Sequence, residues 1–516
     1  MEHQFLSLTG ICLLSSTLLG LVVFSCRKLD EKTNEKPEPY HVPSVVPYLG
    51  HLIGIIWYRN GYYTKISAKY NKLPIYTLPV LKGQIYVINE PDLIVAAQRQ
   101  PKIISFWQVE AMSITTLGAI STSGSKKLKN IPSQVHHAEK VQGQGLLLDG
   151  LSATHRAMAP GLGFQEMLLA AREPIAEALN ALAGRITAQV HVDMWQWVKH
   201  EVTHATTESV YGPMNPYRDL AVENGFWDFS DNVMWLMSGP TLSKILASKG
   251  CEGRATVIAA FLEYFRKNGH ESGSALVKAR VKVMKRELPQ SDIAALECVN
   301  GQAILVNSVP TAFWTLWQVY SNDEILHAVR GEVDAITSFK DGWKTISLPT
   351  LTNLPILEST MQETLRYRSC GVGPRMVLED TVLESKHHLR KGSYVMFDNR
   401  SLHLHKPTWG SDSEDFNMRR FIKPIDRRRI QRSSAFRGFG GGANLCPGKD
   451  FASLEIMAFV AMFVARFDMI PDKGRWENLQ QDLSNVALAI SPPASKVFVQ
   501  IVERESLGGL KWKFED

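Results

Sequence analysis

The stretch "AFRGFGGGANLCPGKDFA", residues 435–452, places one cysteine at the end of a glycine-rich loop and just before an expected helix. The glycines at 440–442 permit positive φ angles, so the backbone can lie flat against a bulky group. Gly448 allows the following helix to pack close to whatever the sulfur contacts. We expect backbone N–H groups and the helix N-terminus to lower the pKa of Cys446, as a thiolate metal ligand requires.

The composition is that of a folded globular protein, with 45% hydrophobic and 21% charged residues in a chain of 516. A net charge of +6 is modest for this length and does not favour a nucleic-acid partner. The cysteines are scattered without any C-x-x-C pair, which disfavours both a disulfide framework and a zinc site. They are Cys12, Cys26, Cys251, Cys298, Cys370 and Cys446.

The N-terminus predicts a membrane anchor over residues 1–28. Residues 5–26 carry no charge, and as a helix they would span roughly 33 Å. Arg27 and Lys28 follow directly, so the positive-inside rule places the rest of the chain on the cytoplasmic side. A cleaved signal peptide is the alternative, but it would need positive charge before the apolar run. Residues 29–50 become proline-rich and predict an extended hinge.

Residues 51–516 predict one large, mainly α-helical body with small β-sheets. The segments 164–186 and 255–269 have apolar residues at spacings of three and four, which indicates helices. Residues 73–91 alternate around a glycine and predict a β-hairpin, and strand-like runs recur at 391–399 and 495–503.

The pattern Phe439-x-x-Gly442-x-x-x-Cys446-x-Gly448 resembles the heme-binding signature of the cytochrome P450 family. The resemblance implies the P450 fold, with heme b held through the Cys446 thiolate as axial ligand of the iron. It also implies a monooxygenase that receives electrons from NADPH through NADPH-cytochrome P450 reductase, with cytochrome b5 as a second possible donor. The anchor then implies a single-pass protein of the endoplasmic reticulum membrane.

Further segments match the family in the expected order. Glu363-x-x-Arg366 and Arg420 of "FNMRRF" would form a structural triad behind the heme. Arg375 lies where family members commonly bind a heme propionate, a role that suits a bidentate, always charged guanidinium.

The central helix, residues 298–324, departs from the family pattern. Val306 stands at the usual acid position and Asn307 at the usual alcohol position. An amide can hydrogen-bond oxygen in the site or order a water, but it cannot relay a proton as a hydroxyl does. Pro310 should kink the helix and leave a carbonyl without its donor.

Two details indicate which branch of the family the chain resembles. The run "NSVPTAFW" is similar to sterol hydroxylases of bile-acid pathways and to prostacyclin synthase, and Asn444 replaces the usual Arg or His two residues before the cysteine. The Trp-x-x-x-Arg motif that family members usually carry on an earlier helix is absent, which leaves His155 or Arg156 as candidates for its arginine position. The segments "AFRGFGGGANLCPG", "VPTAFW" and "YGPMNP" are together similar to fungal members that modify terpenoids, alkaloids or polyketides.

These observations predict hydroxylation or another oxidation of a lipophilic small molecule, with Asn307 and Cys446 in the catalytic site. The substrate would contact the central helix, the loop after Arg366 and the C-terminal turn, through Ile304, Ser308, Val372, Gly373 and Ile490. A heme-thiolate isomerase or dehydratase that needs no external electrons is an alternative. A non-catalytic heme-binding membrane protein is another.

Positive charge is concentrated between Arg419 and Arg437, with eight basic residues against one acid, Asp426. Such a patch would steer an acidic electron-donor protein toward the cysteine loop. A solvated loop held by anionic lipid explains the same charge equally well.

Overall fold

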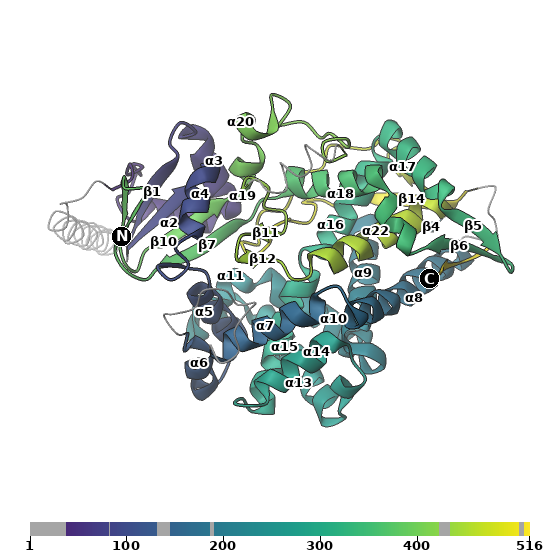
Figure 1. The fold of residues 1–516 in the computed structure, drawn as a ribbon, viewed down its shortest axis with the longest axis horizontal. Helices are drawn as coiled ribbons and strands as arrows, with labels where there is room; N and C mark the ends of the chain where they lie inside the picture. The colour runs from purple at the N-terminus through teal and green to yellow at the C-terminus, as the bar shows by residue number, and fades with distance from the viewer. Residues whose placement is uncertain are drawn as a thin grey trace, which may run out of the picture. The chain divides into compact units, whose positions relative to one another are not determined.

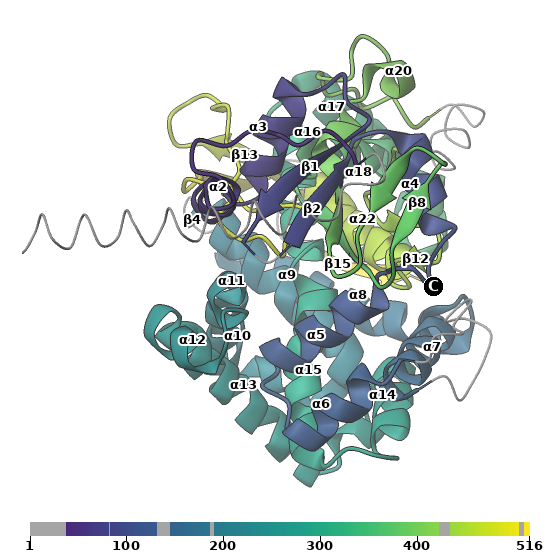
Figure 2. The ribbon, with the colours of Figure 1, turned by 90° about the vertical axis from the view of Figure 1, so that its left-hand side faces the viewer.

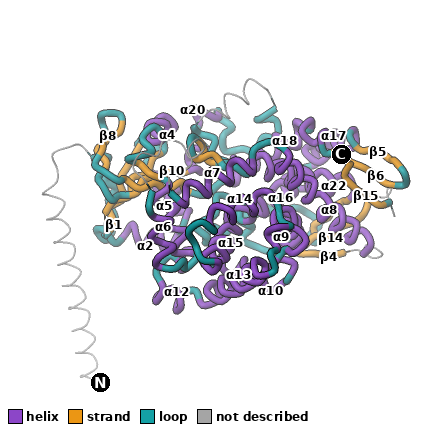
Figure 3. Tube along the Cα trace, turned by 60° about the horizontal axis from the view of Figure 1, so that its bottom comes forward, coloured by secondary structure: helices purple, strands orange, loops and turns teal. Residues whose placement is uncertain are grey.

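The computed structural model describes residues 38–81, 83–131, 145–185, 190–422, 434–504 and 510–515. The expected anchor and the first part of the hinge lie outside these residues. Within the described ranges, no helix is both long enough and apolar enough to cross a membrane. The described chain is mainly helical with several small sheets, as the sequence predicts (Figure 3).

The chain divides into two compact units. The first consists of the described residues up to Ser105 together with Gly373–Asp398. The second consists of Phe106–Val372 and the described residues from Asn399 onward, and it contains the cysteine loop.

The first unit is built on a sheet with strand order β1-β2-β10-β7-β3. Its hairpin pairs Ile75 with Ile88, which confirms the prediction for residues 73–91, and β10 confirms the strand predicted at 391–399 (Figure 1). The described part of the predicted hinge is extended only over residues 38–43, where His41 bridges to Thr77 of β1; residues 45–49 form bends and a turn, and α2 already begins at Gly50. The elements are α2 (Gly50–Tyr58), α3 (Asn60–Lys69), β1 (Ile75–Val80), β2 (Gly83–Ile88), α4 (Pro91–Gln98), β3 (Ile104–Ser105), β7 (Val372–Val377), β8 (Thr381–Leu383), β9 (His387–Leu389) and β10 (Tyr394–Asp398).

The core of the second unit is a group of packed helices, α8 (Leu162–Arg185), α9 (Met194–Tyr211), α16 (Ser308–Tyr320) and α22 (Lys449–Arg466). Every residue of α16 is buried, and α22 is buried continuously over Glu455–Arg466. Burial of apolar surface at about 25 cal/mol per Å² holds these helices together. The helix that follows the cysteine loop is therefore anchored deep in the core.

A second group of helices packs against α15 (Gln290–Leu305), and it includes α10 (Leu220–Asp231) and α13 (Ser248–Arg266). Here α10 and α13 cross at two glycines: a Cβ on Gly253 would lie 2.1 Å from the carbonyl oxygen of Gly225. The helices predicted at 164–186 and 255–269 correspond to α8 and α13, although residue 186 is not described.

The remaining elements of the second unit are shorter helices and small sheets with orders β13-β14-β4, β15-β6-β5 and β11-β12. Strand β14 confirms the prediction at 495–503. They are α5 (Trp107–Leu117), α6 (Thr122–Lys129), α7 (Leu146–Met158), β4 (Val190–Asp193), η1 (Gly212–Met214), η2 (Pro216–Arg218), α11 (Val233–Leu236), α12 (Pro240–Leu246), η3 (Gly269–Glu271), α14 (Ala275–Met284), α17 (Asp323–Ala335), β5 (Thr337–Lys340), β6 (Trp343–Ser347), η4 (Pro349–Asn353), α18 (Pro355–Arg368), α19 (Asn399–His403), α20 (Lys406–Trp409), β11 (Gly440–Gly441), β12 (Asn444–Leu445), β13 (Phe467–Pro471), β14 (Phe498–Glu503) and β15 (Lys511–Glu515).

Candidate functional site

The glycine-rich loop is a tight hairpin in which β11 pairs with β12. Gly440 and Gly442 have φ angles of +74° and +63°, as predicted, and a Cβ on Gly440 would lie 2.8 Å from the carbonyl oxygen of Asn444. Gly441 does not have a positive φ; a Cβ there would instead lie 2.8 Å from Nη1 of Arg437. The glycines are thus required by backbone conformation and by close approach.

Cys446 leaves this hairpin just before α22. Its N–H donates to the carbonyl of Phe439 over 2.9 Å, which fixes the end of the loop. The residue keeps an exposed surface, although neighbouring protein atoms largely desolvate its thiol. Burial raises the pKa of Cys446, and the hydrogen bond from the Gly448 N–H only partly opposes this. The expectation that the loop by itself lowers this pKa is therefore wrong, because desolvation outweighs the backbone donor.

These residues fit a bound heme iron. Cys446 keeps an exposed surface at the point where the chain leaves the hairpin for α22, and a Cβ on Gly448 would make only ordinary contacts, 3.8 Å from the sulfur and 3.7 Å from Cε of Met158. A thiol with a raised pKa becomes a stable anion when a metal ion coordinates it, since the metal charge displaces the proton. No group of three or more His, Cys, Asp or Glu within the described residues offers a rival metal site.

The predicted triad forms behind the loop. Glu363 and Arg366 on α18 make two hydrogen bonds of 2.7 and 2.8 Å, and both side chains are fully buried. Arg420 completes the triad through Nε at 3.1 Å from Glu363 Oε1. Arg366 also donates to the carbonyls of His403 and Ser413. The triad ties α18 to the segment that leads to the cysteine loop, which confirms its structural role.

The central helix is broken where the sequence departs from the family. Helix α15 ends at Leu305 and α16 begins at Ser308, which confirms an interruption just before Pro310. Proline has no N–H to donate to the carbonyl of Val306, four residues earlier. Asn307 occupies the break, and its Oδ1 accepts a 3.0 Å hydrogen bond from the N–H of Ala489 in the C-terminal turn. Its amide is therefore held in one orientation.

The predicted substrate residues of the second unit are placed near this break, with different accessibility. Ile304 is half-buried on α15, whereas the hydroxyl of Ser308 turns back to the Ile304 carbonyl over 3.2 Å. Ile490 is buried and bridges to Ser369, which brings the C-terminal turn against the loop that leads to Val372. Asn307, Ile304 and this turn therefore come together around the helix break.

Two predicted residues belong to the first unit. Gly373 lies in β7 against the ring of Phe397, and Arg375 is buried in the same strand. Nη1 of Arg375 donates to the carbonyl of Pro374 over 2.7 Å. The propionate role of Arg375 stays a prediction, and so does the role of His155 or Arg156; both lie on α7, where Nη1 of Arg156 donates to Ser152 Oγ over 2.6 Å.

Only part of the basic run lies in the described chain. Arg437 is buried and the side chain of Arg420 is only 7% exposed, so neither charge belongs to a surface patch, while exposed Arg419 pairs with Glu324 at 3.1 Å. The other basic members and Asp426 are not described. They are Lys423, Arg427, Arg428, Arg429 and Arg432.

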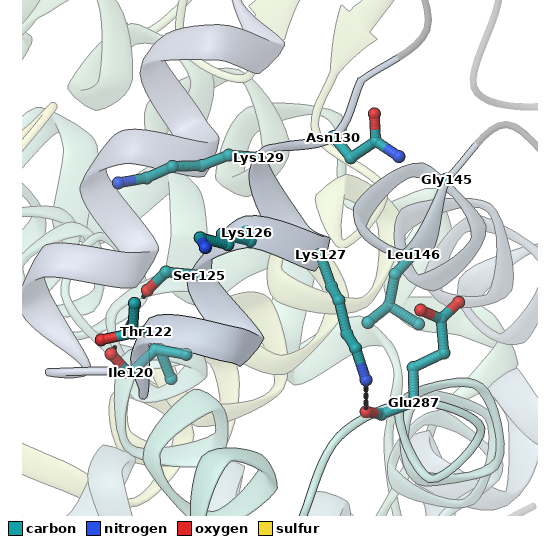
Figure 4. Close-up of a pocket in the computed structure, with 10 residues that line it drawn as sticks. All are labelled: Ile120, Thr122, Ser125, Lys126, Lys127, Lys129, Asn130, Gly145, Leu146 and Glu287. Carbon is teal, nitrogen blue, oxygen red and sulfur yellow. Dashed lines mark hydrogen bonds between the residues drawn. The ribbon is translucent and has the colours of Figure 1, made fainter.

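A different basic surface lies at α6. Lys126, Lys127 and Lys129 border an open recess of about 810 Å³ (Figure 4). Lys127 Nζ donates to the backbone carbonyl of Glu287, whereas Lys126 and Lys129 extend in other directions. All three are exposed, so the recess adds positive charge to the surface but no enclosed binding site.

The sequence did not predict the contacts that hold the C-terminal turn in place. Arg368 stacks on Trp314 with its guanidinium carbon 3.8 Å from the ring centroid, and Trp314 Nε1 donates to the carbonyl of Ser491 over 2.7 Å. Together with the Ala489 N–H, these contacts fix the turn against α16 and α18. A backbone donor 182 residues from its acceptor leaves no signal in the sequence.

Comparison with known proteins agrees with this geometry. A family model described as cytochrome P450 matches residues 278–497. The chain is 34% identical over 493 residues to cytochrome P450 monooxygenase nodJ of Hypoxylon pulicicidum, with 92% of each chain covered. It is 24% identical to a cytochrome P450 monooxygenase of Gibberella zeae over 98% of each chain. It is 26% identical to cytochrome P450 7B1 of Mus musculus over 90% of each.

Proposed function

This chain belongs to the cytochrome P450 family of heme-thiolate monooxygenases, and we propose that it oxidises a lipophilic small molecule in fungal secondary metabolism. The oxidation would be a hydroxylation or a related insertion of one oxygen atom, using O2 and two electrons from NADPH. The observation that carries this proposal is the exposed residue Cys446, which directly follows the glycine hairpin and precedes α22. The triad supports the same assignment: Glu363 and Arg366 are fully buried, and the side chain of Arg420 is 7% exposed.

Cys446 would hold the iron of heme b, which when bound supplies the activation of O2. The carbonyl of Phe439 accepts the N–H of Cys446, and the positive φ of Gly442 permits the tight turn of the hairpin that would hold the heme. Gly448 gives the sulfur a backbone donor, which moderates its basicity. Arg375 would bind a heme carboxylate.

The substrate would lie over the helix break. Ile304, Val372 and Ile490 would offer apolar contacts, and Gly373 would contribute its backbone surface. Ser308 would contribute its carbon surface, since its hydroxyl is used within the helix. Asn307 would act as a fixed hydrogen-bond donor: its Oδ1 is engaged by Ala489, so its NH2 group remains to orient a water or oxygen.

We propose that residues 1–28 anchor the enzyme in the endoplasmic reticulum membrane with the catalytic residues on the cytoplasmic side. The apolar run supports this, and so do exposed hydrophobic residues that follow the hinge: Ile53 and Trp57 on α2 are 52% and 78% exposed. Electrons would come from NADPH-cytochrome P450 reductase, with cytochrome b5 as an additional donor. The substrate would be a terpenoid, alkaloid or polyketide; the full-length likeness to fungal monooxygenases supports the fungal setting of this proposal.

The test begins with reduced protein under carbon monoxide, which should show the strongly red-shifted Soret band of thiolate ligation. Cys446→Ser should lose this band, whereas Cys251→Ser, at a half-buried cysteine in α13, should keep it. Membranes with reductase, NADPH and labelled O2 are then incubated with candidate intermediates, and mass spectrometry should find one labelled oxygen in the product. Turnover without NADPH would favour the isomerase instead. If both variants kept the band, the thiolate assignment would be overturned.

A further inference from the structure

A cavity of about 240 Å³ in the second unit reaches the break between α15 and α16, where Val306 and Pro310 line it. Its other walls come from α9, from α10 and from the C-terminal segment that includes Leu488. Figure 2 shows α10 beside α13 and α15. All of these elements belong to the second unit, so the cavity is a feature of one compact body.

The buried end of the cavity adjoins Asn307. Val306 directly precedes Asn307, and Leu488 directly precedes Ala489, whose N–H binds Asn307 Oδ1. Because neighbouring Cα atoms are about 3.8 Å apart, the cavity lies next to this hydrogen bond on both of the chain segments that form it. The cavity therefore comes close to the side chain that the sequence places in the catalytic site.

The other end of the cavity is charged and open to solvent. Asp231 on α10 and Ser484 are exposed at this mouth. Lys199 on α9 and Asp482 also line the cavity and are half-buried. Val306, by contrast, is only 3% exposed. The lining therefore changes from charged, solvent-exposed residues at the mouth to buried residues at the helix break.

Polar groups around the cavity have hydrogen-bonding capacity that the protein does not use. Pro310 has no N–H to offer the carbonyl of Val306. Trp227 lines the cavity, and its Nε1 is buried without a hydrogen-bond partner among the residues that the structure describes. The same holds for Nε2 of Gln302, whose Oε1 accepts from Ser230 in the cavity wall over 3.3 Å. A volume of about 240 Å³ has room for up to about eight water molecules, which can satisfy such groups.

The proposed reaction needs protons at the site beside Asn307. Insertion of one oxygen atom of O2 releases the other atom as water and takes up two protons together with the two electrons. Neither Val306 nor the amide of Asn307 can relay a proton. We propose that the cavity holds a chain of water molecules that brings protons from solvent to this site, and that Asp231 passes them in at the mouth. This inference rests on the proposed function, which consumes the protons.

The surroundings of Asp231 suit this exchange. In each transfer its carboxyl group gives a proton to water in the cavity and takes one from bulk solvent, so no electrons move. Partial desolvation raises the pKa of the carboxyl group to about 6; the Lys199 ammonium opposes this rise, and Asp482 and Asp228 add to it. Near neutral pH the group can therefore both release and take up a proton.

The first test asks whether the cavity holds water, and it uses the heme-loaded full chain without turnover. Oxygen-17 relaxation dispersion of the solvent counts long-lived internal water molecules, and the reduced carbon monoxide form is diamagnetic, so the iron does not interfere. Ser230→Leu places a larger, apolar side chain in the cavity wall and should lower the count by about two. Ser238→Leu, at an exposed serine outside the cavity, should leave the count unchanged.

The second test asks whether Asp231 passes protons in. Asp231→Asn should lower the product formed per NADPH about tenfold and increase the solvent isotope effect, and Asp231→Glu should keep most of the product. Millimolar formic acid should restore part of the loss in Asp231→Asn, because a small weak acid carries protons in place of the side chain. Asp228→Asn removes an exposed carboxylate of the same helix that does not line the cavity. It controls for the loss of charge and should behave as wild type.

Three results would overturn the proposal. An unchanged water count in Ser230→Leu would mean that the cavity is dry, and wild-type coupling in Asp231→Asn would mean that protons arrive by another route. A loss in Asp231→Asn that formic acid does not restore would leave Asp231 with a structural role only. Labelled-oxygen incorporation by wild type reports on the proposed function, whereas the water count needs no turnover, so failure of that function is distinguishable from failure of this inference.

Discussion

The backbone N–H of Ala489 donates a 3.0 Å hydrogen bond to Oδ1 of Asn307, across 182 residues of sequence. This bond joins the break between α15 and α16 to the C-terminal turn. It also fixes the side chain, because an amide whose oxygen accepts from Ala489 must direct its NH2 group elsewhere. One residue thus holds two parts of the candidate substrate site together and supplies a donor at the point where the family usually has a hydroxyl.

The two roles of Asn307 can be separated by substitution. Asn307→Asp keeps an acceptor for the Ala489 N–H but loses the NH2 donor, whereas Asn307→Leu loses both. We expect the Asp variant to unfold in urea close to wild type but to form about tenfold less product per NADPH consumed. The Leu variant should show the same loss and should also be less stable by about 1 kcal/mol. Wild-type coupling in the Asp variant would show that the donor is not used.

Arg419 and Arg420 are adjacent in sequence but differ in environment, which makes them a matched pair. Arg420 is buried against Glu363 and Asp412, whereas Arg419 pairs with Glu324 in solvent. Arg420→Ala leaves a buried network incomplete and should lower the free energy of unfolding by about 3 kcal/mol. Arg419→Ala should lower it by less than about 1 kcal/mol. Urea unfolding followed by tryptophan fluorescence measures both; equal losses would contradict a structural role for the triad.

The sequence predicted those features that depend on local chemistry. The positive φ of Gly440 and Gly442, the Glu363–Arg366 pair and the interruption near Pro310 each follow from residue type and short spacing. It did not predict the pKa direction at Cys446, because desolvation depends on atoms brought from elsewhere in the fold. The partner of Asn307 was missed for the same reason: the donor is a backbone amide, which every residue but proline carries.

The stacking of Arg368 on Trp314 predicts a specific difference between arginine and lysine. The guanidinium lies 3.8 Å from the ring centroid and donates to the Leu479 carbonyl, and burial lowers its pKa to about 10. Arg368→Lys keeps the charge but loses the planar stack, so the free energy of unfolding should fall by about 2 kcal/mol. The exposed Arg218→Lys, measured in the same urea series, should cost less than about 1 kcal/mol. A smaller effect at Arg368 than at Arg218 would contradict the importance of the stack.

Glu455 predicts how stability changes with pH. It is buried on α22 and accepts a 3.0 Å hydrogen bond from Thr206 Oγ1, and burial raises its pKa from the ordinary 4.5 to about 8. The folded protein therefore holds this proton at neutral pH, whereas the unfolded chain releases it above pH 4.5. Because the folded state binds more protons between these values, its stability falls as pH rises through that range and levels off above about pH 8.

Glu455→Gln removes this ionisation while preserving shape, so the variant should lose the part of the pH dependence that Glu455 contributes. At pH 8 it should be more stable than wild type by about 4 kcal/mol, and near pH 4.5 the two should be similar. Urea unfolding at intervals from pH 4.5 to 8.5 gives the two curves. Glu252→Gln, at an exposed position of α13, should follow wild type throughout. Parallel curves for wild type and Glu455→Gln would mean that Glu455 is ionised in the folded protein, and that α22 tolerates a buried charge beside Thr206.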